Sequence, residues 1–65
     1  MTAKLTRAEV TAMRESVLRE ETKRGRRLMA SRFIRDVLTA IAQGRCTDHR
    51  FCARLAIRTW AEANR

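Results

Sequence analysis

The chain contains no proline and only two glycines, Gly25 and Gly44, so very few of its residues favour tight turns. Small β-sandwiches and barrels need turn residues roughly every ten positions, and that pattern is missing here. With 65 residues, the chain is long enough for one domain. The sequence therefore predicts a single all-α domain, residues 1–65, built of three helices joined by short turns.

The supply of large apolar side chains is small. Only 13 of the 65 residues are leucine, isoleucine, valine or phenylalanine, while ten are alanine. This fraction is near the lower limit for a core that is stable alone, and small domains are often completed by association. We therefore expect a homodimer or a higher oligomer, and no pocket suited to an elaborate enzyme.

The start of a first helix is well marked. Thr6 as N-cap with Glu9 three residues later makes a capping box, and Leu5 and Val10 are spaced as a hydrophobic staple. A narrow apolar stripe at helical spacing follows, typical of a helix that packs along one seam between subunits or between helices. The predicted oligomer interface is this stripe together with the single tryptophan: Val10, Met13, Val17 and Trp60.

The end of this helix depends on Gly25. Residues 19–27 are almost all polar, and Gly25 offers a left-handed cap, which predicts a helix over residues 7–24 and a break near residues 24–28. Because no proline intervenes, the alternative is a kinked or continuous long helix through Gly25, at a cost of about 1 kcal/mol relative to alanine.

A second helix is predicted over residues 29–43, ended by Gly44 at the position after its C-cap. Its apolar residues fall on one half of a helical wheel. They are Met29, Ala30, Phe33, Ile34, Val37, Leu38, Ala40 and Ile41.

A third helix is predicted over residues 48–63. Thr47 is the expected N-cap, with Asp48 in the first turn, where a carboxylate favours the helix dipole. Its apolar face comprises Phe51, Cys52, Leu55, Ala56, Thr59, Trp60 and Ala63. With Leu38 and Trp60 assigned to the core, replacing either by alanine is expected to cost about 2–5 kcal/mol.

The positive charge is concentrated in two segments. The net charge is +8, of which residues 19–35 carry +5 and residues 45–58 carry +3. Such clustering indicates a polyanionic partner, with a solvated charged face that keeps the protein soluble as the alternative. The candidate binding residues are Lys23, Arg24, Arg26, Arg27, Arg45, Arg50, Arg54 and Arg58.

Arg50, Arg54 and Arg58 recur every four residues on the polar side of the third helix. Because no base-reading amide or hydroxyl accompanies them, this row suits phosphates better than base edges. We therefore predict a small nucleic-acid-binding protein, a regulator or accessory factor, with DNA favoured over RNA. The alternative is a protein-interaction module, an inhibitor or adaptor, whose basic face docks on an acidic surface of a larger protein.

Cys46, His49 and Cys52 are spaced three residues apart. A thiolate–imidazole pair is sterically possible, but no third group is placed to orient the ring. Structural zinc sites want four ligands, usually in two pairs, and a reducing cytosol disfavours a disulfide. The sequence therefore favours packed thiols and predicts no enzyme activity, metal or cofactor.

The longest run without a charged residue, residues 37–44, has eight residues. This is far short of the roughly 20 apolar residues that a membrane span needs, and charges also interrupt the N-terminal end, where a secretory signal would lie. We expect a cytoplasmic protein that does not bind membranes.

Overall fold

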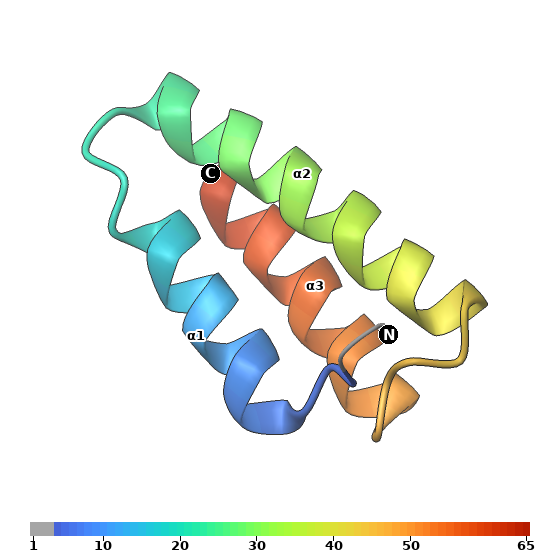
Figure 1. The fold of residues 1–65 in the computed structure, drawn as a ribbon. Helices are drawn as coiled ribbons and strands as arrows, with labels where there is room; N and C mark the ends of the chain where they lie inside the picture. Colours follow the sequence, from blue (N-terminus) through green and yellow to red (C-terminus); the bar gives the residue numbers. More distant parts are fainter. Residues whose placement is uncertain (1–3) are drawn as a thin grey trace.

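The computed structural model describes residues 4–65 and consists of three α-helices, each of which contacts the other two (Figure 1). The helices are α1 (Arg7–Leu18), α2 (Lys23–Ala42) and α3 (His49–Ala63). Figure 1 shows α3 beside both other helices, running in the direction of α1 and opposite to α2. The prediction of three packed helices is confirmed, while residues 1–3 of the predicted domain lie outside the described residues.

Local hydrogen bonds set both ends of α1. The Thr6 hydroxyl accepts a hydrogen bond from the Glu9 backbone N–H (3.2 Å) and donates one to the Glu9 carboxylate (3.1 Å), which confirms the predicted N-cap. The helix ends at Leu18, where the Arg19 N–H still donates to the Glu15 carbonyl (3.0 Å). The predicted end at residue 24 is therefore wrong.

The reason for the early end is Thr22, which caps α2. Its backbone is extended, and its hydroxyl accepts a hydrogen bond from the Gly25 N–H (2.9 Å). Gly25 thus lies in the first turn of α2, and the break falls at residues 19–22 instead of 24–28. This turn also rules out a continuous helix from α1 into α2. A Cβ on Gly25 would lie 2.6 Å from Glu20 Cγ and 2.8 Å from Thr22 Oγ1, so glycine permits the turn to approach the helix closely.

Gly44 ends α2 as predicted. Its φ of +69° is in the left-handed region, which favours glycine. Its N–H donates to the Ile41 carbonyl (3.0 Å), and the Arg45 N–H donates to the Ala40 carbonyl (2.9 Å). These two bonds form a Schellman motif that satisfies the last carbonyls of the helix.

The N-cap of α3 is Asp48, one residue later than the predicted Thr47. The Asp48 Oδ1 atom accepts a hydrogen bond from the Phe51 N–H (3.1 Å). Thr47 instead holds the N-terminal segment, since its N–H donates to the Leu5 carbonyl (3.1 Å) while the Leu5 N–H donates to the Arg45 carbonyl (2.8 Å). This pairing ties the segment before α1 to the α2–α3 connection.

The core is small and receives side chains from all three helices. Its buried apolar residues are Leu5, Val10, Val17, Ala30, Phe33, Val37, Ala40, Cys52, Ala56 and Ala63. Because four of these ten are alanine, the buried stripe on each helix is narrow. Two residues assigned to the core from the sequence lie outside it, since Leu38 is 57% exposed and Trp60 is 44% exposed. The apolar half of the predicted second helix is wider than its two neighbours can cover.

Candidate functional site

Arg50, Arg54 and Arg58 lie on the exposed side of α3, where the sequence predicted them. They are one helical turn apart, so their Cα atoms rise about 6 Å per step along the helix axis. Arg50 and Arg54 also line an open hollow of about 280 Å³ together with Arg7 and Asp48. Within residues 4–65, none of the three guanidinium groups of this row forms a hydrogen bond or a close ion pair.

The second predicted cluster lies at the start of α2. Its exposed members are Lys23, Arg24 and Arg27. Arg26 differs, because its Nη1 atom donates to the backbone carbonyls of Glu20 (2.8 Å) and Glu21 (3.1 Å). Arg26 therefore stabilises the turn between α1 and α2, and its role as a binding residue stays a prediction.

Arg45 belongs to the connection between α2 and α3. Its side chain is half-buried, and its Nε atom donates to Gln43 Oε1 (2.6 Å). With 20 residues, α2 is about 30 Å long, in a bundle 34 Å long. The cluster at the start of α2 therefore lies at the opposite end from Arg45 and Arg50, next to the end of α3 (Figure 1).

The acidic residues are gathered around α1. Four of the seven lie on α1 or in the turn after it: Glu9, Glu15, Glu20 and Glu21. Of the others, Asp48 pairs with Arg7 (2.8 Å) and Glu62 pairs with Arg14 (2.7 Å), both arginines of α1. Asp36 lines two hollows together with a residue of α1, Met13. The arginines of α1 thus neutralise the acidic residues at the start and end of α3.

These contacts keep both carboxylates ionised. The Phe51 backbone N–H and the Arg7 guanidinium lower the pKa of Asp48 below its usual value. The hydrogen bond from Arg14 likewise lowers the pKa of Glu62. Arg14 also donates to the buried Thr59 hydroxyl (3.0 Å), so one arginine links α1 to α3 at two points.

The surface of α2 and α3 that is turned away from α1 is here called the outer face. At about 100° per residue, Leu38 lies about 160° around α2 from Asp36, and Trp60 lies about 160° around α3 from Glu62. Ile57 lies about 140° from Glu62. All three side chains are exposed: 57% for Leu38, 68% for Ile57 and 44% for Trp60. The outer face therefore has an apolar centre, a feature that the sequence reasoning missed.

Arginines flank this apolar centre on both sides. Arg24, Arg27 and Arg35 lie about 100–180° around α2 from Asp36, and Arg50 lies about 120° around α3 from Glu62. Arg35 was not among the predicted binding residues. Among residues 4–65, the outer face carries no acidic side chain, because all seven acidic residues lie on α1, beside it or in the turn after it.

The stripe predicted to join subunits lies inside the bundle. Val10 and Val17 are buried in the core of a single chain, and Met13 packs against that core. Of the two interpretations of this stripe, the structure therefore shows the seam between helices. Trp60, the fourth residue of the predicted interface, is on the outer face.

Cys46, His49 and Cys52 do not form a ligand set. In the part of the chain that the structure describes, no three histidine, cysteine or acidic side chains converge on a position for a metal ion. Both cysteines are free. Burial, and then the contact with Cys46, raise the pKa of Cys52 to about 11, so this thiol stays protonated at neutral pH.

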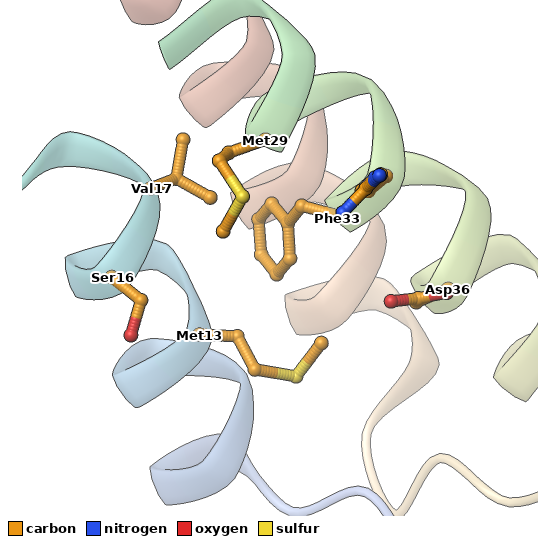
Figure 2. Close-up of a pocket in the computed structure, with 7 residues that line it drawn as sticks. Met13, Ser16, Val17, Met29, Phe33 and Asp36 are labelled. Atoms are coloured by element: carbon orange, nitrogen blue, oxygen red, sulfur yellow. The ribbon is translucent and has the colours of Figure 1, made fainter. Parts of the chain in front are cut away.

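An open pocket of about 330 Å³ lies between α1 and α2 (Figure 2). Its floor is apolar, with Met13, Met29 and Phe33 turned into the gap, and Ser16 and Asp36 lie at its sides. Among the described residues, every buried polar side-chain atom has a hydrogen-bond partner. No unpaired buried group is therefore left in this pocket to bind a ligand. The outer face, which is bordered by arginines, is therefore a better candidate for a binding site than this pocket.

Within residues 4–65, no helix has both the length and the apolar character needed to cross a membrane. Comparisons with protein-family models, with curated proteins and with solved structures gave no match for this chain.

Proposed function

We propose that the protein binds nucleic acid through its phosphates, using the arginines of α2 and α3. The observation that supports this proposal is the exposed row of Arg50, Arg54 and Arg58 on α3, whose guanidinium groups have no close ion pair within residues 4–65. The two carboxylates beside this row, Asp48 and Glu62, are paired with Arg7 and Arg14 of α1. The chain as a whole carries a net charge of +8. Each phosphate neutralised by such a surface releases condensed counterions, which favours binding.

The arginine row of α3 supplies the central contacts. Arg50, Arg54 and Arg58 present forked donors that suit phosphate oxygens, and Arg24 and Arg27 extend the basic surface near the end of α3. Because the row holds no amide or hydroxyl side chain that would read base edges, we expect DNA duplexes of different sequence to bind about equally.

Fluorescence anisotropy of a labelled DNA duplex of about 20 base pairs, titrated at several salt concentrations, tests this proposal. For each phosphate contacted, the slope of log K against log salt becomes more negative by about 0.9. Replacing Arg50, Arg54 and Arg58 by alanine should weaken binding to all duplexes and reduce the slope by two to three such steps.

The matched control removes the same charge elsewhere, at three exposed residues outside the row: Lys4, Arg19 and Arg65. This alanine triple variant should bind much more tightly than the variant of the α3 row. Equal losses in the two triple variants would show that net charge alone attracts the DNA, and a parent protein that binds no duplex at low salt would reject the proposal.

An acidic protein surface is the second candidate partner. The observation that favours it is the exposed apolar centre of the outer face, formed by Leu38, Ile57 and Trp60. Aliphatic side chains form no favourable contact with phosphate groups, whereas protein–protein interfaces bury them.

A further inference from the structure

We propose that the outer face docks one amphipathic helix of a partner protein, with apolar residues along its centre and acidic residues along both edges. This inference rests on the second candidate function and names the chemistry of the partner. It does not require nucleic-acid binding, although both proposals use Arg24 and the arginine row of α3.

The shape of the apolar centre fits a helix. Ile57 and Trp60 are three residues apart on α3, and the half-buried Ile34 and the exposed Leu38 are four residues apart on α2. Both pairs therefore lie on one side of their helix, with steps of about 4.5 Å on α3 and about 6 Å on α2 along the axis. These two short apolar rows on adjacent helices are here called the strip. A helix docked along them would present anchors at positions i, i+3 or i+4, and i+7.

The size of the exposure indicates that this strip is covered by a partner. Single exposed apolar residues are common on soluble proteins, but a contiguous group on one face marks an interaction site. Leu38, Ile57 and Trp60 are 57%, 68% and 44% exposed and share one face of two neighbouring helices. Only 13 residues of the chain are leucine, isoleucine, valine or phenylalanine, and three of them, Leu28, Leu38 and Ile57, are exposed, two of these in the strip.

Charge identifies the edges of the partner. Arg24 and Arg35 lie on the α2 side of the strip, and Arg54 lies on the α3 side, three residues before Ile57 and about 60° around the helix from it. Acidic side chains on both edges of a docked helix would meet these guanidinium groups. A second copy of this chain fits poorly, since it would bring the same arginines against one another.

Trp60 makes the proposal directly measurable, because it is the only tryptophan and the chain has no tyrosine. The probe is a synthetic helix of about 18 residues, long enough to be helical, made of leucine, glutamate and alanine, with leucine on one stripe and glutamate on both flanks. We expect the emission of Trp60 to shift to shorter wavelength and to saturate as this peptide is added. A scrambled peptide, and a peptide with lysine in place of glutamate, should leave the emission unchanged.

Two substitutions with a matched control locate the contact. Leu38→Gln and Ile57→Gln should each weaken peptide binding about tenfold, the size expected for loss of an interface anchor. Leu28→Gln is the control, since Leu28 has the same 57% exposure on the same helix but lies outside the strip; it should change binding less than twofold. All three side chains are exposed, so the variants should stay folded, which circular dichroism verifies.

Other results would overturn the proposal. An unchanged emission with the leucine–glutamate peptide, or an equal shift with the lysine peptide, would reject the acidic helix. A shift with phosphatidylglycerol vesicles and not with the peptide would assign the strip to a membrane surface, and a shift with protein concentration alone would assign it to a second copy. Leu38→Gln should bind the labelled DNA duplex as the parent does, so loss of one partner is distinguishable from loss of the other.

Discussion

Phe33 and Leu38 lie on the same helix but have opposite surroundings: Phe33 is 2% exposed in the core, and Leu38 is 57% exposed. Phe33→Ala should destabilise the fold by about 3–5 kcal/mol, because it empties a buried site. Leu38→Ala should change the free energy of unfolding by less than about 0.5 kcal/mol. Thermal or urea unfolding followed by circular dichroism measures both values. A cost of several kcal/mol for Leu38→Ala would return this residue to the core, where the sequence had predicted it.

Asp48 combines two roles that a single substitution separates. Its pKa is lowered by the Phe51 N–H and by Arg7, so its contribution to stability is present above the pKa of the unfolded chain, about 4. This contribution is lost as the pH falls through the lower pKa of the folded state. Asp48→Asn keeps an N-cap residue but removes the charge. Between about pH 5 and pH 3 the midpoint of thermal unfolding should therefore fall less in this variant than in the parent. Identical pH profiles would show that the charge of Asp48 contributes nothing to stability, whether through the Phe51 N–H or through Arg7.

The turn between α1 and α2 is controlled by two residues with different roles, Thr22 as N-cap and Gly25 as the point of close approach. Alanine is the better helix former by about 1 kcal/mol, so propensity alone predicts that Gly25→Ala stabilises α2. The structure predicts the opposite sign, because the new Cβ would lie 2.6 Å from Glu20 Cγ and 2.8 Å from the capping oxygen of Thr22. The midpoint of thermal unfolding should fall, and adding Glu20→Ala should restore part of the loss. A higher midpoint for Gly25→Ala would contradict this account.

Of the helix ends set by short-range hydrogen bonds, the sequence predicted those at Thr6 and Gly44 and missed those at Thr22 and Asp48. Thr6 and Gly44 were recognised because their bonds reach only neighbouring residues. The polar segment 19–27 does contain the break, but Gly25 was interpreted as the cap that ends the first helix, whereas Thr22 caps the second one. Thr47 was wrongly predicted as the N-cap of α3. It binds the Leu5 carbonyl instead, and local sequence rules do not predict such a long-range hydrogen bond.

The outer face is formed by the packing of α2 and α3. The sequence could therefore predict some of its residues but not how they are arranged on one surface. The arginine row of α3 follows from spacing along one helix. That the acidic residues all gather near α1 depends on the packing that pairs Asp48 with Arg7 and Glu62 with Arg14. The apolar centre was missed because helical periodicity shows which residues share a side but not how much of that side neighbours cover. Ile57, between Arg54 and Arg58 on the polar side of α3, was its one visible signal.

Self-association stays a prediction. The structure changes which surface we expect the two copies to use, and at which salt concentration. Val10 and Val17 are already buried within one chain, so an apolar contact with a second copy would need the exposed side chains, of which Leu38, Ile57 and Trp60 share the outer face. Arginines flank these residues, so repulsion should keep the protein monomeric at low ionic strength. At about 1 M salt the screening length falls to about 3 Å, and apolar contact should then dominate. Sedimentation equilibrium should therefore show a mass that increases with salt, the reverse of the trend expected for DNA binding. A dimer that dissociates as salt is added would show that the copies meet through ion pairs, on a face other than this one.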